Sequence, residues 1–271
     1  MIYYHGYAIE KNLGDDACFQ AFIEMLRPEY RNLVTKNPDK NCMLAVLGGG
    51  ILITNQNENG FYGFKGIIDR IKIKETITFG TGYDFIENEG SKSWTEDVKK
   101  TFNEEDCYWR GPITLDEMKG YGRVSGDSAL CFLNRLNHTS KNGEKYGISY
   151  GPSKGKYKTD DIFEFLKNLD KKYIKFMPVC KEDLDTMISD FGNICDCSIE
   201  NDFLKYMRLI RNDVKIMLSM KLHSSIASYC AGVDYINFQY RIKCKDFEQS
   251  KEMIDLKILS NGVNEKIDKL V

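Results

Sequence analysis

The amino-acid sequence predicts an α/β protein made of parallel sheets in two lobes. Short apolar runs alternate with amphipathic helical segments along most of the 271 residues, and this rhythm is typical of a doubly wound parallel sheet. Residues 214–247 alone contain a strand, a helix and a second strand, which together make a βαβ unit. The polar stretch 138–143 separates two alternating runs, so we expect an N-terminal lobe at 1–138 and a C-terminal lobe at 139–271.

In the first lobe, the predicted strands are short and apolar, and glycine follows several of them. They are residues 1–7, 43–47, 77–79 and 105–109. A helix follows the first strand, because Phe19, Phe22, Ile23 and Leu26 recur at the helical spacing i, i+3, i+4, i+7. A short helix is also expected from Pro112, a residue favoured in a first helical turn, to a stop at Gly120.

The second lobe continues the alternation with four expected strands, at 146–150, 173–179, 214–218 and 234–240. Four helices are expected with them, at 160–169, 182–188, 203–210 and 224–230. The last of these is rich in small residues and ends at Gly232. A terminal helix is expected at 247–259, and the polar residues 264–271 are expected to form a solvated end.

The composition limits the classes of partner. A formal net charge of -2 and a pI near 6.0 favour neither nucleic acid nor a bulk membrane surface. Nine cysteines at irregular spacing indicate reduced thiols in a cytoplasmic protein, and Cys195 and Cys197 lie one residue too close for the CxxC pair of a zinc site. No apolar run approaches the length that spans a bilayer, so a lipid-linked substrate would be met at the inner face of the membrane.

Glycines at two predicted strand ends are candidate substrate-binding residues. Gly48, Gly49 and Gly50 follow a buried strand, where glycine lets the backbone approach a ligand or simply make a tight turn. Gly80 and Gly82 follow the next strand, and a GxG without a third glycine predicts no nicotinamide cofactor.

Asp15 and Asp16 begin the first helix of the chain. Aspartate is favoured in the first turn of any helix, because it complements the helix dipole. A role in binding the substrate, or in accepting a proton from it, is the second interpretation of this pair.

Cationic and titratable side chains are predicted to lie where strands end, which is where open α/β sheets bind ligands. They are Arg110, Lys221, His223 and Lys243. Together they describe an anion site with one titratable group, because histidine is the side chain whose unperturbed pKa lies nearest neutrality. A surface ion pair for Arg110 and a buried, hydrogen-bonded His223 are the alternatives. With three histidines and no metal-ligand cluster in the sequence, metal-free chemistry is expected.

The region around His223 resembles the polysaccharide pyruvyl transferase family. That family carries Arg-Leu-His, a small-residue helix, an Ala-Gly-Val turn, a strand and a Tyr-Asp-Pro-Lys-like segment closed by an aromatic residue. The corresponding residues here are Lys221-Leu222-His223, Ala231-Gly232-Val233, Tyr240-Arg241-Ile242-Lys243 and Phe247. Lysine therefore replaces the family's arginine at position 221, and Arg241-Ile242 replaces its Asp-Pro.

Further similarity lies in the first lobe. The family's Asn-x-Gly-Asp loop, glycine triplet and strand-end arginine correspond to Asn12, Gly14 and Asp15, to Gly48–Gly50 and to Arg110. Gly111 departs from the aspartate that usually follows that arginine. Gly126-Asp127 is similar to a Val-x-Gly-Asp-Pro segment, in which we expect Asp127 to be structural.

The resemblance implies a fold like that of the two-lobed GT-B glycosyltransferases, with the active site in the cleft between the lobes. It implies transfer of the pyruvyl group of phosphoenolpyruvate to a sugar of a cell-surface polysaccharide precursor, soluble or lipid-linked, to form a cyclic ketal without a cofactor. His223 would act as the general acid, while Lys221, Arg110 and Lys243 would hold the carboxylate and phosphate of the donor.

Two other functions stay open at this point. A nucleotide-sugar glycosyltransferase of the same architecture would use His223 and the lysines to meet a diphosphate. A glycan-binding homologue without catalysis is motivated by Lys221 and by the missing Asp-Pro. The acceptor sugar, the position of the ketal on it and the oligomeric state are not indicated by the sequence.

Overall fold

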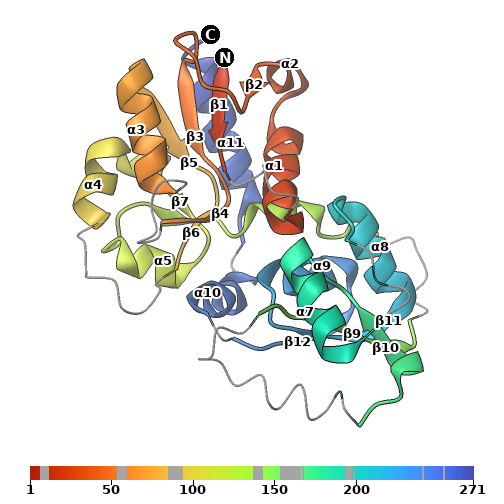
Figure 1. The fold of residues 1–271 in the computed structure, drawn as a ribbon. Helices are drawn as coiled ribbons and strands as arrows, with labels where there is room; N and C mark the ends of the chain where they lie inside the picture. The colour runs from red at the N-terminus through yellow and green to blue at the C-terminus, as the bar shows by residue number, and fades with distance from the viewer. Residues whose placement is uncertain are drawn as a thin grey trace. The chain divides into compact units, whose positions relative to one another are not determined.

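The computed structural model describes residues 1–6, 12–53, 60–84, 94–136, 143–152, 166, 168–192, 197, 199–239, 241–252 and 254–271. The chain forms two compact units. The first unit comprises Met1–Ala8, Ala17–Cys131 and Arg241–Val271, and the second comprises Ile9–Asp16 and Phe132–Tyr240. Figure 1 labels the helices and strands of both units.

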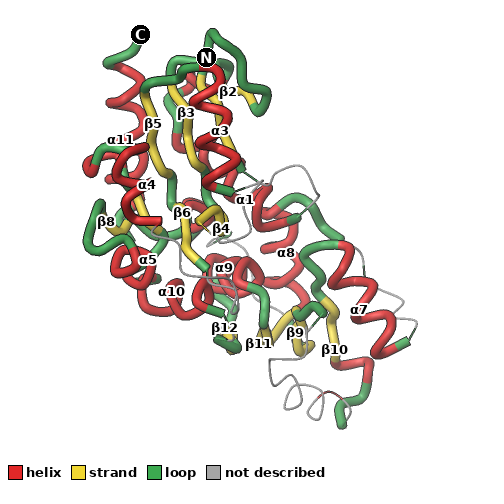
Figure 2. The backbone as a smooth tube through the Cα atoms, turned by 60° about the vertical axis from the view of Figure 1, so that its left-hand side comes forward, coloured by secondary structure: helices red, strands yellow, loops and turns green. Residues whose placement is uncertain are grey.

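The first unit contains a parallel four-stranded sheet in the order β2-β1-β3-β5 (Figure 1). Figure 2 labels β2, β3 and β5 of this sheet in a second view. Its strands are β1 (Ile2–His5), β2 (Val34–Thr35), β3 (Leu44–Leu47) and β5 (Glu75–Thr78). Because β1 lies between the two strands that follow it in the chain, the chain reverses direction across the sheet between β1 and β3. Such a reversal leaves a crevice at the carboxyl ends of the two strands, which is the usual ligand site of open α/β sheets.

A second parallel sheet of the first unit continues from the first. It has the order β4-β6-β7-β8, with strands β4 (Gly50–Ile53), β6 (Thr81–Tyr83), β7 (Tyr108–Trp109) and β8 (Arg123–Val124). β4 follows β3 after Gly48 and Gly49, and β6 follows β5 after Phe79 and Gly80. Gly80 has a φ of 64°, a left-handed conformation in which glycine carries no Cβ penalty.

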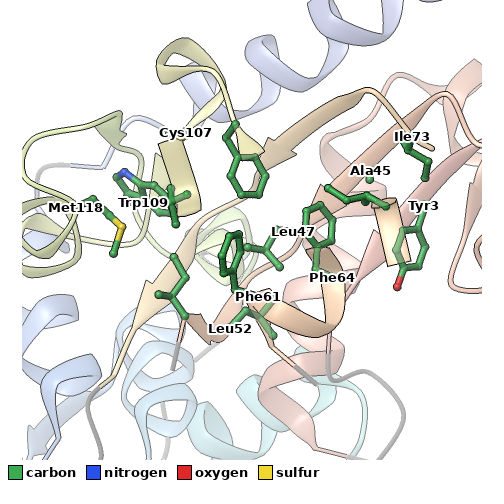
Figure 3. Close-up of a cluster of buried hydrophobic side chains, with 14 of the residues drawn as sticks. Tyr3, Ala45, Leu47, Leu52, Phe61, Phe64, Ile73, Cys107, Trp109 and Met118 are labelled. Carbon is green, nitrogen blue, oxygen red and sulfur yellow. The ribbon is translucent and has the colours of Figure 1, made fainter. Parts of the chain in front are cut away.

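Helices cover both faces of the first unit's sheet. Side chains of β1 and β3 point alternately to the two faces. Ile2 and Leu44 belong to a core with α11 (Leu256–Asp268) and with the part of α1 (Leu13–Met25) that follows Ala17. Tyr3, Ala45 and Leu47 face α3 (Phe61–Ile71) and α4 (Trp94–Thr101), where Phe61 and Phe64 fill the core (Figure 3). The remaining elements are α2 (Pro28–Arg31), α5 (Pro112–Glu117), α10 (Ile242–Ser250), η1 (Glu104–Asp106) and η2 (Ser128–Phe132).

The second unit repeats the same strand order with its own parallel sheet, β10-β9-β11-β12. The strands are β9 (Lys145–Ser149), β10 (Ile174–Phe176), β11 (Val214–Ser219) and β12 (Asp234–Asn237), and the helices are α7 (Lys181–Phe191), α8 (Phe203–Asp213), α9 (Leu222–Ala231) and η3 (Lys171–Tyr173). Met187 of α7 packs with Ile148 and Leu218, while α8 and α9 pack on β11. The chain reverses across this sheet between β9 and β11.

The predicted α/β class with parallel sheets is confirmed, and the predicted βαβ unit is β11, α9 and β12. The GT-B comparison stays a prediction. Most of the expected helix 160–169 and nearly all of the expected linker 138–143 lie outside the described residues. Within the described part of the chain, no helix is long and apolar enough to cross a membrane.

The C-terminal part of the chain differs from its prediction. Instead of one helix at 247–259, α10 and α11 form separately, and Asp255 caps α11 by accepting hydrogen bonds from the N–H groups of Lys257 and Ile258. Residues 264–271 are not a wholly solvated end, because Asn264 is buried and Ile267 is fully buried in the core of the first unit. The contacts therefore place Arg241–Val271 with the first unit, whereas the sequence assigned these residues to the second lobe.

The predicted strand 105–109 is also shorter than expected. Glu104–Asp106 form the 3-10 helix η1, and only Tyr108 and Trp109 form β7. Acidic residues favour turns and helix starts over strands, so the run of acidic residues before Cys107 delays the start of the strand.

Candidate functional site

Charged residues follow three neighbouring strands of the first unit. Asp84 comes directly after β6, Arg110 directly after β7, and Asp127 soon after β8. β6, β7 and β8 are parallel neighbours, so their carboxyl ends meet at one edge of the sheet. All three side chains are almost completely buried, with exposed fractions of 1%, 0% and 0%.

Arg110 is a buried cation with an unsatisfied end. Its Nε lies 2.8 Å from Oδ2 of Asp127 in an ion pair. Its Nη1 and Nη2 have no hydrogen-bond partner among the described residues. Asp127 is held in turn by the Ala129 N–H, which donates to its Oδ1 at 3.0 Å. A buried guanidinium with unpaired N–H groups is costly unless a ligand or another anion completes its hydrogen bonds.

Asp84 gathers further cations at the same edge. Arg241, which precedes α10, forms an ion pair with its Oδ2. Burial raises the pKa of Asp84, while the positive charges of Arg241, Lys243 and Arg110 oppose that rise. Two of the predicted site residues, Arg110 and Lys243, therefore lie close enough to one carboxylate to act on it electrostatically.

The predicted glycines of the first unit each make room for a neighbouring group. A Cβ on Gly48 would overlap the Tyr4 ring, and one on Gly49 would lie 2.7 Å from Cys18 Sγ and from Ser128 Oγ. Gly50 has a φ of 106° where β4 begins. These contacts explain the glycines by packing. Because Gly48 and Gly49 follow β3, they also lie at the reversal between β1 and β3.

Gly80 and Gly82 are explained by packing as well. A Cβ on Gly82 would lie 2.8 Å from Nη1 of Arg110. A Cβ on Gly80 would lie 3.0 Å from the carbonyl oxygen of Gly126. Gly82 therefore admits the guanidinium of Arg110, and contact of either glycine with a substrate stays a prediction.

In the second unit, Lys221 lies at the reversal between β9 and β11, two residues after the end of β11. Its Nζ forms an ion pair with Oδ1 of Asp183 at 2.5 Å, and the exposed fractions of the two side chains are 22% and 0%. Gly151 makes the pair possible, because a Cβ there would overlap the carboxylate and lie 2.5 Å from the lysine Nζ. Burial raises the pKa of Asp183, and the Lys221 charge opposes that rise.

His223 lies in the first turn of α9, beside the start of α1. A Cβ on Gly14 would overlap the His223 imidazole at Nδ1, so the glycine lets the ring lie against the helix start. Asn12 fixes that start by accepting a hydrogen bond from the Gly14 N–H at 3.0 Å. Asp15 and Asp16 follow in the first turn of α1, and their role stays a prediction.

Buried hydroxyl groups hold the first turn of α9. Ser224 Oγ lies 2.6 Å from Ser149 Oγ and 2.8 Å from the Tyr206 hydroxyl. The Tyr206 hydroxyl donates to the Met177 carbonyl at 2.9 Å. Ser219 Oγ both donates to the Lys221 carbonyl and accepts from the Lys221 N–H, which fixes the turn between β11 and α9. These hydrogen bonds fix the backbone conformation around Lys221 and His223.

Sequence reasoning missed the acidic partners of these cations. Asp84, Asp183 and Asp246 are buried and carry raised pKa values because of burial. Their partners Arg241, Lys221 and Thr114 lie far from them along the chain, so no short sequence motif indicates these pairs. A single cue existed for Asp84, which follows a GxG at a strand end.

A separate groove of ≈ 560 Å³ lies on the first unit, lined mainly by α11, η1 and the starts of β5 and β7. Lys266 lines it and bridges Asp106 at 2.6 Å and Glu75 at 3.0 Å. Because β5 and β7 begin there, the groove lies at the amino ends of the strands. None of the predicted site residues lines it.

Comparison with known proteins gives a family and a fold. The search of curated proteins found no match. A crystal structure of a functionally uncharacterised protein from Klebsiella pneumoniae subsp. pneumoniae NTUH-K2044 is similar, with a TM-score of 0.51 and 15% sequence identity over 93% of this chain and 87% of that chain. This likeness supports the fold alone. The family model described as polysaccharide pyruvyl transferase matches residues 5–240, a span that includes Arg110, Lys221 and His223. The chain therefore belongs to the polysaccharide pyruvyl transferase family.

Proposed function

We propose that the protein transfers the pyruvyl group of phosphoenolpyruvate to a sugar of a cell-surface polysaccharide precursor, forming a cyclic ketal and releasing phosphate. Family membership supports the reaction class. The observation that carries the choice of an anionic donor is Arg110, a completely buried guanidinium whose Nη1 and Nη2 lack hydrogen-bond partners in the described part of the chain. A carboxylate or phosphate would satisfy both N–H groups at once, because the guanidinium fork matches their geometry.

The other cations have roles that fit the same donor. Lys243, in the first turn of α10, adds a point charge near Arg110 and Asp84. Lys221 is shared with Asp183, and since the lysine is 22% exposed and has three N–H groups, it can still donate to a ligand. That the groups of the two units meet on one donor stays a prediction, as do contacts from Gly48–Gly50 and from Asp15 and Asp16.

The proposed chemistry balances without a metal or an organic cofactor. An acceptor hydroxyl attacks the enol carbon of the donor while a proton is added to its methylene carbon. The bond from the enol carbon to the phosphate oxygen then breaks, and a second sugar hydroxyl closes the ketal on the enol carbon. The protons of the two hydroxyl groups balance the proton added to the methylene carbon and the proton that leaves with the phosphate. His223 supplies the proton as general acid, and the cations stabilise the charge that grows on the departing phosphate.

Release of inorganic phosphate from phosphoenolpyruvate, measured with a panel of soluble and lipid-linked sugars, tests the proposal. The expected result is phosphate release that depends on one acceptor and that yields a pyruvylated sugar by mass spectrometry. Stabilisation of the protein by nucleotide sugars but not by phosphoenolpyruvate would favour a glycosyltransferase. Binding of glycans with no phosphate release from any acceptor would favour a glycan-binding protein.

The His223→Ala variant tests the assignment of the general acid. We expect turnover to fall by ~10²–10⁴-fold, the usual contribution of such a group. Affinity for phosphoenolpyruvate should stay within a few-fold, because a general acid acts on the transition state more than on the bound donor. A parallel loss of donor binding would assign His223 to positioning instead.

A further inference from the structure

Asp246 of α10 joins that helix to α5. Its Oδ1 accepts a hydrogen bond from the Ile113 N–H at 2.8 Å, and its Oδ2 accepts one from the Thr114 hydroxyl at 2.6 Å. The side chain is completely buried. The contact spans 133 residues of sequence, so it links two elements that nothing in the local sequence relates.

The beginning of α5 needs a partner of this kind. Gly111 occupies its N-cap position and has no side chain that could accept from the first N–H groups. Asp246 of α10 provides a carboxylate that accepts these hydrogen bonds instead, and its negative charge also complements the α5 dipole. Gly111 leaves room for this contact, because a Cβ there would overlap the Asp246 carboxylate and lie 2.7 Å from the Asp246 carbonyl oxygen.

A second contact holds the other side of the first turn of α10. Arg241, at the N-cap position of the helix, is ion-paired with Asp84 after β6. Lys243 lies between Arg241 and Asp246 in the sequence and acts electrostatically on Asp84. Arg110 acts electrostatically on both Asp84 and Asp246. The two contacts thus hold Lys243 beside Asp84 and Arg110.

We infer that Asp246 is a positioning residue, which joins α10 to the start of α5 and thereby holds Lys243 at the charge cluster of Asp84 and Arg110. Its effect on turnover rests on the proposed function, in which Lys243 and Arg110 hold the donor. Its effect on the charge cluster does not, because the cluster lies within one unit and can be measured without any substrate.

The titration of the Asp84 carboxyl group, followed by NMR, is the substrate-free measurement. Among the described residues, the charged and titratable groups that act on Asp84 are Arg241, Lys243 and Arg110, with Tyr83 and Cys244 also nearby. If Asp246 no longer holds α10, the cations of α10 move away and the Asp84 pKa rises by about one unit, because a nearby opposite charge favours the ionised carboxylate.

Four variants separate positioning from capping. Asp246→Ala removes the contact, and Gly111→Ala forces α10 away while keeping the carboxylate. Both should raise the Asp84 pKa. Asp246→Asn keeps an oxygen for the Ile113 N–H and should leave the Asp84 pKa near its original value. Asp255→Ala is the matched control, because it removes the cap of α11 in the same unit and should lower the melting temperature without changing the Asp84 titration.

In turnover, Asp246→Ala and Gly111→Ala should each lower kcat/KM for the donor by at least about ten-fold, within the range that misplacement of a site group produces. Adding Asp246→Ala to Lys243→Ala should cause little further loss of kcat/KM, because both changes remove the same contribution.

An unchanged Asp84 titration in Asp246→Ala and Gly111→Ala, or an equal rise of the Asp84 pKa in Asp255→Ala, would overturn the inference. If the titrations behave as expected but the original protein releases no phosphate, the proposed function fails and the positioning of Lys243 stands.

Discussion

Gly14 shows how the absence of one methyl group decides where the proposed general acid, His223, can lie. The His223 imidazole occupies the space that a Cβ on Gly14 would fill. Nothing about the Gly14 backbone requires glycine, since its φ is outside the left-handed region. The requirement is therefore steric, and the three atoms nearest to the added Cβ all belong to the His223 imidazole. The first helix of the chain and the predicted general acid are coupled through this single contact.

The Gly14→Ala variant should lower turnover without unfolding the protein. The new methyl group displaces the imidazole, and misplacing a catalytic group by about 1 Å costs on the order of 10² in rate. Affinity for phosphoenolpyruvate should change by only a few-fold. Steady-state kinetics and donor titration measure the two quantities.

Gly66→Ala is the matched control for Gly14→Ala. It also replaces a helical glycine, but nothing lies within 4 Å of the added methyl group. It should stabilise the protein by about 0.5–1 kcal/mol through the helix preference for alanine, with turnover unchanged. Full activity of Gly14→Ala would show that the imidazole can act from a second position.

Lys221 has two roles in the proposed site, because it neutralises the buried Asp183 and meets the donor. Lys221→Met keeps the length of the side chain but removes both interactions. It should weaken donor binding by about 1.5–3 kcal/mol, which is roughly ten- to a hundred-fold. It should also raise the Asp183 pKa further, because the opposing charge is gone. Calorimetric titration of phosphoenolpyruvate measures the first effect.

Two companion variants separate the roles of Lys221. Lys221→Arg keeps the charge and should keep or improve donor affinity, since a guanidinium fork suits a carboxylate or phosphate. Asp183→Asn removes the partner and leaves the lysine, so donor affinity should be retained. Equal donor affinities of the original protein and Lys221→Met would mean that Lys221 serves Asp183 only.

At the scale of elements, sequence periodicity predicted strands and helices where the apolar pattern was strong. β3, β11 and α9 lie close to their predicted limits. α11 was missed because its buried face is sparse. Leu259, Val263 and Ile267 recur every four residues between polar side chains, and the sequence gives no sign of the sheet they cover. Amphipathic spacing shows that a face is buried, but not against which unit.

Substitution of Ile267 tests whether α11 is part of the first unit's core. Ile267→Ala removes a completely buried side chain and should destabilise the first unit by about 2–5 kcal/mol, through lost apolar burial and the cavity left behind. Val271→Ala, at a position with 78% exposure in the same terminal segment, should change stability by less than about 0.5 kcal/mol. Similar melting temperatures for the two variants would contradict the assignment of α11 to that core.

For the whole molecule, the parallel α/β fold predicted from the sequence is confirmed, while the candidate site at the strand ends stays a prediction. The sheets β2-β1-β3-β5 and β10-β9-β11-β12 have the same order of strands, and each reversal lies next to a predicted motif, Gly48–Gly50 in the first unit and Lys221–His223 in the second. The buried acidic partners could not be predicted, because ion pairs such as Asp84 with Arg241 depend on tertiary packing. The same holds for the capping of α5 by Asp246.

The pH dependence of folding stability follows from these buried carboxyl groups, and Asp183 shows the sign. Its pKa in the folded protein lies above the ordinary value of 3.8, because burial disfavours the charge. The folded state therefore holds its proton more tightly than the unfolded state. The stability that this contributes is complete below pH 3.8 and is lost as pH rises through the raised pKa.

Asp183→Asn removes that titration, so its unfolding free energy relative to the original protein should rise with pH above 3.8 and level off above the raised pKa. The slope cannot exceed about 1.4 kcal/mol per pH unit for one proton. The Lys221 charge is already part of this titration, because it opposes the rise of the Asp183 pKa that burial causes. Asp170→Asn is the control with the opposite sign, because Lys172 holds the Asp170 pKa below 3.8, so that variant should lose relative stability as pH rises toward 3.8. Denaturant unfolding from pH 3 to pH 8 measures both curves, and a relative stability of Asp183→Asn that falls with pH would mean that the Lys221 charge outweighs burial at Asp183.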